Sequence, residues 1–316
     1  MKEYSVSKKG WIEIALASAI FVGLAIVAAL YDLAINQALY NPESLFGQFF
    51  ARLGETPSYL AAPTVGAILF HQNYGERKFF SFFPKLLFAG LVFAGWFFCL
   101  YAWVWGNFID PELPYALVYQ LVFSGFLTVA VLLATSLVDK KAMKKLLLFA
   151  LFVLIVAGVS NAIVQIMKAV WSRQRFRTMV DNEMNASLIA AYGDKFAGFA
   201  PWYKPQSLFP SPIRDEAYIA AHKAIDSDSF HSFPSGHTVA AAASYAIIIL
   251  PIMYEKLKKY NTLFWLLPTL YTITVAISRI IMGAHYLSDV LFGGYIGLAI
   301  AALTRYIIVK KRSKAA

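Results

Sequence analysis

Long apolar runs dominate this sequence and restrict what it can fold into. About eight of them have few charges and lengths near the ~20 residues that an α-helix needs to cross a bilayer. A membrane β-barrel would instead show short segments of alternating hydrophobicity. We therefore predict an all-α fold, a polytopic bundle of transmembrane helices, with spans near 11–30, 57–72, 86–106, 116–138, 146–167, 237–254, 263–282 and 289–309.

The composition agrees with a membrane protein. Hydrophobic residues make up 59% of the chain and charged residues only 15%, whereas soluble domains carry roughly 25% charged residues. A net charge of +10 is also found in proteins that bind nucleic acid, but here the basic residues cluster between apolar runs, as they do in membrane proteins. We predict the bilayer, and no nucleic acid, as a partner. The single cysteine, Cys99, excludes an intrachain disulfide.

The basic clusters also predict an orientation. They mark the N-terminus, every second connection and the C-terminal tail, at Lys8 and Lys9; Arg77, Lys78 and Lys85; Lys140, Lys141, Lys144 and Lys145; Lys256, Lys258 and Lys259; and Lys310, Lys311, Arg312 and Lys314. Eight spans with both ends in the cytoplasm would give this alternation. The third connection contains Asp110 and Glu112 but no basic residue, which suits the outside. We predict a multi-pass protein of the cell (plasma) membrane, whose first helix is retained as its insertion signal.

One polar insertion, 178–233, is too long for a simple connection. It would form an extracytoplasmic lid or small ordered cap, or else a binding surface for a separate protein. We expect two regions: N-terminal transmembrane helices over 1–145, and a catalytic transmembrane core over 146–316 that includes this insertion.

The first of three polar clusters at outer helix ends is KAVWSRQR. Lys168 and Arg175 are seven residues apart, so they share one face if the helix continues, and two cations there could grip one anion. The alternative is that they anchor the helix by reaching lipid headgroups. We expect Arg173 and Arg177 to make headgroup or loop contacts.

The second cluster is Pro234-Ser235-Gly236-His237, at the start of a predicted helix. Ser235 is a favourable N-cap and Gly236 allows a ligand to approach the backbone closely. Free N–H groups at a helix start bind anions, and His237 can exchange a proton near neutral pH. An ordinary capped helix start with an interfacial histidine is the alternative.

The third cluster holds Ser278, Arg279, His285 and Asp289. His285 and Asp289 are neighbours if helical, and an Asp beside a His fixes its tautomer and stabilises the imidazolium. Arg279 can join them only if the chain bends near Gly283. A structural ion pair is the alternative.

The predicted topology places all three clusters on the outer face, although it was derived without them. Three cations, two histidines, a carboxylate and a helix N-terminus would then meet. Cations neutralise phosphate oxygens, one histidine can attack phosphorus, and the other can protonate the leaving oxygen. The set therefore indicates phosphoryl transfer.

At these residues the chain resembles the type 2 phosphatidic acid phosphatase (PAP2) superfamily. Its signature, K-x6-R-P, P-S-G-H and S-R-x5-H-x3-D, is matched in order and spacing by KAVWSRQRF (168–176), PSGH (234–237) and SRIIMGAHYLSD (278–289). Phe176 replaces the usual proline, which leaves the backbone path after Arg175 to be established. The family core has six helices, so a hairpin would be added in the first half of this chain.

The resemblance implies a metal-independent membrane phosphatase, with no cofactor, acting on phosphatidate, phosphatidylglycerophosphate or an isoprenyl diphosphate. His285 would be the nucleophile that forms a phosphohistidine, Asp289 would orient it, and His237 would be the general acid. The phosphate would be bound by Lys168, Arg175, Ser235, Gly236 and Arg279.

Two other functions remain open at this stage. A lipid phosphotransferase would pass the phosphate to a second alcohol, and a lipid or anion transporter would use the same cations as a binding site, although transporter sites usually lie at mid-membrane. The remaining histidines, His71, His222 and His231, are interpreted as a helix end and two loop residues. Gly293 and Gly297 predict close helix packing within the chain. The oligomeric state is left open.

Overall fold

A computed structural model describes residues 8–72, 74, 78–105, 115–180 and 186–315, and helices account for all of the regular secondary structure in those ranges. The prediction of an all-α fold is confirmed. The first half contains α1 (Lys8–Leu39), α2 (Leu45–Leu53), α3 (Thr56–Tyr59), α4 (Ala61–Phe70), α5 (Lys78–Leu100), the π-helix η1 (Tyr101–Trp105) and α6 (Ala116–Ser136). The second half contains α7 (Lys140–Leu154), the π-helix η2 (Ile155–Val159), α8 (Ser160–Trp171), α9 (Phe176–Met179), α10 (Ala186–Tyr192), α11 (Glu216–Ile225), α12 (Gly236–Ala242), the 3₁₀-helix η3 (Ala243–Ile249), α13 (Leu250–Met253), the 3₁₀-helix η4 (Glu255–Tyr260), α14 (Asn261–Ile281) and α15 (Leu287–Ala315).

Within the described residues, seven helices are long and apolar enough to cross a membrane. They are Ala15–Leu39, Phe82–Trp103, Ala116–Ser136, Lys140–Met179, Gly236–Met253, Glu255–Ile281 and Leu287–Lys311. The chain is thus a multi-pass membrane protein. The predicted span 57–72 is not among them, because the helix is interrupted at Leu60 between α3 and α4. Pro57 and Pro63 each stand in the first turn of their helix, where the missing N–H of proline is tolerated.

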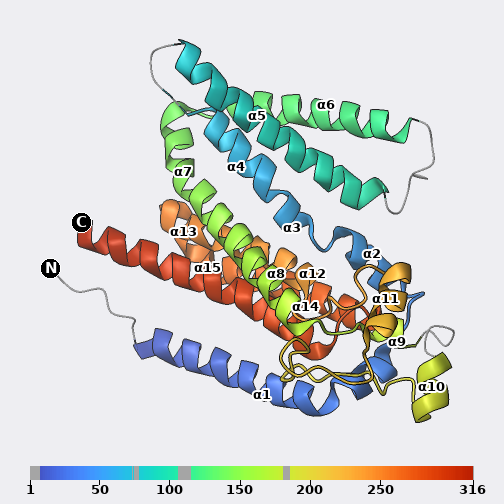
Figure 1. The fold of residues 1–316 in the computed structure, drawn as a ribbon. Helices are drawn as coiled ribbons and strands as arrows, with labels where there is room; N and C mark the ends of the chain where they lie inside the picture. The colour runs from blue at the N-terminus through green and yellow to red at the C-terminus, as the bar shows by residue number, and fades with distance from the viewer. Residues whose placement is uncertain (1–7, 73, 75–77, 106–114, 181–185, 316) are drawn as a thin grey trace.

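The passes nevertheless alternate between two ends of the bundle. Figure 1 shows the start of α1, the end of α15, the end of α4, the start of α5, the α6–α7 connection and α13 at one end, and α3 and α4 together run toward that end from α2. The basic residues of the α6–α7 connection and of η4 lie there, as the orientation argument requires. Asp110, Glu112 and Arg77 fall outside the described residues.

The core lies where α4, α7, η3 and α15 meet, around buried residues such as Phe152, Val156 and Ile248. α15 approaches α12 closely at two of its three glycines, Gly293 and Gly297. A Cβ on Gly297 would lie 2.4 Å from the Cβ of Ala242, and one on Gly293 would lie 2.6 Å from the carbonyl oxygen of Ser235. The predicted close packing within the chain is confirmed, and it holds the start of α12 beside α15.

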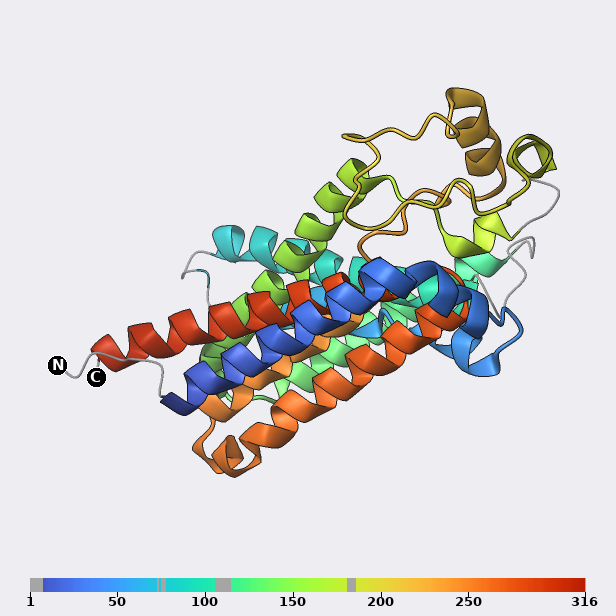
Figure 2. The same cartoon turned by 90° about the horizontal axis from the view of Figure 1, so that it is seen from below.

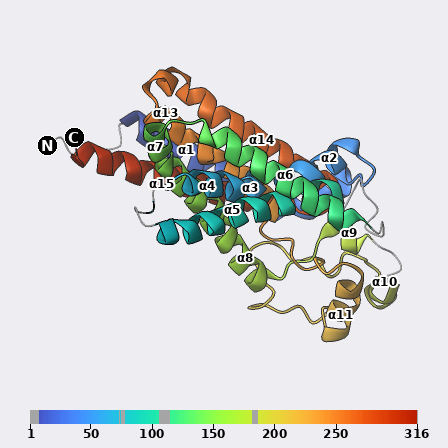
Figure 3. The ribbon, with the colours of Figure 1, turned by 90° about the horizontal axis from the view of Figure 1, so that it is seen from above.

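Two parts lie outside this core. Helices α5 and α6 flank α4 at the edge of the bundle (Figure 1), which is the position expected of an added hairpin. The described part of the insertion 178–233 forms α10, α11 and long loops at the end opposite the termini (Figures 2 and 3). Its Arg214 is buried and donates to the carbonyl oxygens of Gly198 and Ser172, so the insertion folds as an ordered cap on the bundle.

Candidate active site

Three segments distant in the sequence meet beneath this cap: the end of α8, the start of α12 and the turn between α14 and α15. The rings of His237 and His285 have centroids 6.4 Å apart. A Cβ on Gly236 would lie 3.1 Å from Nζ of Lys168, and the Ser235 N–H donates to the carbonyl oxygen of Asp289 at 2.9 Å. The structure therefore brings the three predicted clusters together.

His285 is held in one tautomer. The chain turns at Gly283, whose φ of 61° is in the left-handed region, so the predicted bend is present. Nδ1 of His285 lies 2.6 Å from the carbonyl oxygen of Ser232, which can only accept, so Nδ1 carries the hydrogen. Nε2 is then the atom with a lone pair, and it is buried without a hydrogen bond to any described residue. Burial lowers the pKa of His285 well below its ordinary value, and the nearby Arg175 and Arg279 lower it further, which keeps the ring neutral.

Asp289 acts on His285 mainly through Ser232. Its Oδ2 is 3.7 Å from Nδ1 of His285, beyond normal hydrogen-bond length. The same oxygen accepts the Ser232 hydroxyl, and it also accepts the Tyr286 N–H at 2.8 Å. The contact with Tyr286 is that of a capping box, because Asp289 is the third residue of α15. Asp289 thus fixes both the helix start and the residue that holds His285.

Arg173 is the most buried cation of the site. The predicted loop contact is present, to Ala200, but the side chain does not reach a headgroup. It is 2% exposed and lies between two carboxylates, 2.6 Å from Asp289 Oδ1 and 2.9 Å from Asp32 Oδ2. It also donates to the Ala200 carbonyl oxygen at 2.8 Å and lies 4.0 Å from the centroid of the Tyr286 ring. The guanidinium group presents five N–H donors in a rigid fork, which suits a site with several acceptors. Arg177 does pair with a loop residue, Asp226.

The cations that remain are only partly satisfied. Arg279 is 3% exposed, and its Nε and Nη1 donate to no described residue. Arg175 is 4% exposed; its Nη2 pairs with Asp228 at 3.2 Å, while its Nε is likewise without a partner. A buried charged donor without an acceptor is costly. These groups, with Lys168, form a cation cluster that a bound anion would satisfy.

Ser235 and Gly236 form the start of α12 as predicted. The Ser235 Oγ accepts the Thr238 N–H at 3.2 Å and the Thr238 hydroxyl at 3.0 Å. Because Oγ accepts twice, the hydroxyl hydrogen of Ser235 is left to donate. The absence of a side chain at Gly236 leaves room for Nζ of Lys168.

His237 has a partner that sequence reasoning did not find. Its Nδ1 is 3.3 Å from Oε1 of Glu55, and its Nε2 is 3.2 Å from the carbonyl oxygen of Ala51. Both partners are acceptors, and together they fix the orientation of the ring. Oε2 of Glu55 accepts the Tyr59 hydroxyl at 2.5 Å, which fixes the carboxylate.

With this geometry established, comparison with known proteins decides the family. The model of the PAP2 superfamily matches residues 146–313, more than half of the chain. The chain belongs to the PAP2 superfamily. Every predicted site residue lies inside the range of the PAP2 match.

A curated relative is the "Phosphatidylglycerophosphatase B" of Bacillus subtilis (strain 168), which is 32% identical to this PAP2 chain over 80 residues. That alignment covers 25% of the chain and 39% of the relative's length. No solved structure matches the chain significantly.

Phe176, the departure from the PAP2 signature, leaves the backbone path intact. Arg175 has φ −76° and ψ 146°, the extended conformation that a following proline imposes. Phe176 is the first residue of α9, where proline is favoured. Its ring is 2% exposed and stacks on Phe196 with centroids 5.6 Å apart, so aromatic packing occupies this position.

Residues outside the PAP2 match complete the site. Asp32 accepts the Ser288 N–H at 3.0 Å, and Asn36 donates to the carbonyl oxygen of His285 at 3.0 Å. The predicted first span ended at residue 30, whereas α1 continues to Leu39 and carries both side chains on one face. An ionisable residue at the end of an apolar run was the available signal.

The other histidines lie away from the two catalytic candidates. His71 caps the end of α4, as predicted. His231 lies in a loop, with Nδ1 3.2 Å from Oδ1 of Asp228. The expectation of a loop position was wrong for His222, which is buried in α11 and contacts the carbonyl oxygen of Tyr218. Among the described residues, no group of three or more His, Cys, Asp or Glu is placed to hold a metal ion.

Proposed function

We propose that this protein is an integral membrane phosphatase that hydrolyses a lipid phosphate monoester or diphosphate through a phosphohistidine on His285. One observation carries the proposal. The neutral Nε2 of His285 has no hydrogen bond to a described residue, and it lies near the cation cluster at Arg175 and Arg279. A nucleophile beside unsatisfied cationic donors suits an electrophilic phosphorus whose oxygens carry negative charge.

In the first step, Nε2 of His285 attacks phosphorus and the bond from phosphorus to the leaving oxygen breaks. Lys168, Arg175 and Arg279 bind the phosphate oxygens, helped by the Ser235 hydroxyl and the Gly236 N–H. The Ser232 carbonyl oxygen holds the Nδ1 hydrogen, and the Asp289 carboxylate stabilises the positive charge that develops on the ring.

His237 gives its proton to the leaving oxygen and then takes one from the water that cleaves the phosphorus–nitrogen bond. Glu55 keeps the ring oriented for the first of these transfers. A cavity of about 450 Å³, lined by Glu55, Arg52 and Gln48 among others, provides space for the polar part of the leaving group beside His237.

Two further observations support the proposed lipid substrate and the proposed location of the active site. The Bacillus subtilis relative is named as a phosphatidylglycerophosphatase, which favours phosphatidylglycerophosphate alongside phosphatidate and an isoprenyl diphosphate. Basic residues lie at the end of the bundle opposite the site, which favours the plasma membrane with the active site on the extracytoplasmic face. Residues 146–316 would form the catalytic core, and 1–145 would add Asp32, Asn36 and Glu55 to it.

The test is phosphate release by the purified protein from a panel of lipid phosphates in detergent, with and without a chelator. We expect release without added metal, insensitive to the chelator, blocked by vanadate and abolished in His285→Ala. His231→Ala is the matched control and keeps full activity. Unchanged turnover in His285→Ala, or no release from any substrate by the wild type, would overturn the proposal.

A further inference from the structure

The loop 226–231, between α11 and α12, carries two aspartates that each pair with an arginine. Asp226 Oδ2 lies 2.6 Å from Nη2 and 3.2 Å from Nε of Arg177. Asp228 Oδ2 lies 3.2 Å from Nη2 of Arg175. The main chain fixes this arrangement, because the Arg175 N–H donates to the carbonyl oxygen of Ser229 at 2.8 Å. The loop therefore runs beside the two arginines and places one aspartate on each.

Of these two aspartates, Asp228 is the one that contacts the cation cluster. Its partner Arg175 belongs to the cluster, whereas Arg177 does not. Burial raises the pKa of the Asp228 carboxyl, but Arg175, His231 and Lys168 together lower it below its ordinary value. Lys168 is a second member of the cluster, so the charge of Asp228 acts on two of the cations assigned to the phosphate. A phosphate bound there would be repelled by this carboxylate.

The contact between Asp228 and Arg175 is weak enough to be exchanged. The Asp228 side chain is 57% exposed, and of the Arg175 nitrogens it accepts from Nη2 alone, at the long end of the hydrogen-bond range. Nε of Arg175 is buried without a hydrogen bond to any described residue. Nε and Nη2 lie on the same edge of the guanidinium, so one phosphate can accept from both in the bidentate geometry that arginine favours. A phosphate therefore satisfies Arg175 better than Asp228 does.

We infer that Asp228 is a resident anion that competes with phosphate for Arg175. The substrate phosphate displaces the carboxylate from Nη2, and the carboxylate returns to Nη2 as inorganic phosphate leaves. This inference rests on the proposed function, in which Arg175 binds the phosphate. Asp228 thus weakens the binding of the product and limits inhibition by it, while it also lowers the affinity for the substrate phosphate.

The opposite role for Asp228 would be to hold Arg175 in place for the phosphate. With such positioning, loss of the carboxylate makes phosphate bind more weakly. With competition, loss of the carboxylate makes phosphate bind more tightly. The sign of the change in phosphate affinity therefore separates the two roles.

The experiment compares Asp228→Asn with the matched control Asp226→Asn. Asparagine keeps the shape of the side chain and an acceptor oxygen but removes the charge. Each variant hydrolyses phosphatidate in detergent micelles, and the inhibition constant of inorganic phosphate is measured. Removing a half-exposed charge beside an anion changes the affinity for that anion by roughly three- to tenfold, so we expect the inhibition constant and KM of Asp228→Asn to fall by that factor. Both constants should stay near the wild-type values in Asp226→Asn, and also in Asp228→Glu, which keeps the charge.

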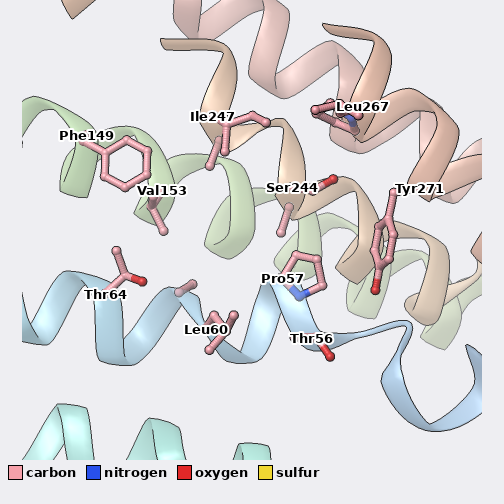
Figure 4. Close-up of a pocket in the computed structure, with 14 residues that line it drawn as sticks. Thr56, Pro57, Leu60, Thr64, Phe149, Val153, Ser244, Ile247, Leu267 and Tyr271 are labelled. Carbon is pink, nitrogen blue, oxygen red and sulfur yellow. The ribbon is translucent and has the colours of Figure 1, made fainter. Parts of the chain in front are cut away.

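A second measurement does not depend on turnover. Inorganic phosphate is titrated into each purified protein in detergent, and the heat of binding is recorded. A cavity of about 470 Å³ elsewhere in the bundle (Figure 4) offers phosphate no competing site, because none of the described residues that line it is acidic or basic. The dissociation constant of phosphate should fall in Asp228→Asn by the same factor as the inhibition constant.

An inhibition constant that is unchanged or higher in Asp228→Asn would overturn the inference. An equal decrease in Asp226→Asn or in Asp228→Glu would overturn it as well, because the effect would then not depend on a charge at Arg175. Failure of the wild type to release phosphate from any lipid phosphate would instead overturn the proposed function.

Discussion

Arg173 offers the sharpest test of the packing that holds the site. We predict that Arg173→Met destabilises the protein by about 3–5 kcal/mol, the usual cost of removing one partner from a buried ion pair. The side chain is 2% exposed and bonds to Asp32 and Asp289, which are 2% and 0% exposed. Methionine fills much of the same volume but leaves these two carboxylates facing each other without a counter-charge.

Arg177→Met is the matched control. The Arg177 side chain is 36% exposed and its partner Asp226 is 23% exposed, and pairs near the surface are worth about 0.2–1 kcal/mol. The two variants should therefore differ by about 3 kcal/mol in free energy of unfolding, measured by denaturant titration in detergent with tryptophan fluorescence.

Adding Asp32→Asn to Arg173→Met should restore part of the loss, because one of the two uncompensated charges is then removed. Equal stability of Arg173→Met and Arg177→Met would refute the reasoning, and so would a further loss in the double variant.

Three more predictions follow from the site. Because burial and Arg175 lower the pKa of His285, kcat/KM of the wild type should persist well below pH 6.5 and fall only as His285 is protonated; Arg175→Met should move this acid limb to higher pH, as a pH series shows. Gly236→Ala should raise KM about three- to tenfold by displacing Nζ of Lys168 by a few tenths of an ångström, while the free energy of unfolding stays unchanged. Phe176→Pro should keep kcat/KM near the wild-type value but lose about 3 kcal/mol of stability with the stacked ring.

For each of these three predictions, one result would contradict it. An acid limb that stays in place in Arg175→Met would mean that Arg175 does not act on His285. An unchanged KM in Gly236→Ala would show that the alanine Cβ fits beside Nζ of Lys168 without displacing it. Loss of phosphate hydrolysis in a folded Phe176→Pro would contradict the backbone path assigned after Arg175.

The predicted site residues could be found because each lies in a short pattern with fixed spacing. The spacing within each pair, Lys168 with Arg175 and His285 with Asp289, corresponds to one or two helical turns and so predicts that the two side chains are close. The alternation of basic connections then predicts that the clusters lie at one end of the bundle. Local patterns and topology were sufficient to locate the cation cluster and both histidines.

The supporting residues were missed for the opposite reason. Asp32 is a single acidic residue whose partner Arg173 is 141 positions away, and no spacing rule links the two. Glu55 is likewise isolated in the sequence and reaches His237 only because α2 and α3 fold back under the start of α12. The break between α3 and α4 at Leu60 was missed because hydropathy averaged over a long window does not show where a helix is interrupted.

The central claim is that His285 becomes covalently phosphorylated during turnover. The most direct measurement is to mix the wild-type protein with a phosphatidate labelled with ³²P in its phosphate, quench within milliseconds in alkali, and map the label by peptide mass spectrometry. We predict base-stable, acid-labile label on the peptide that contains His285, and none in His285→Ala. Turnover by the wild type with label on another residue, or with no labelled peptide at any quench time, would contradict the account.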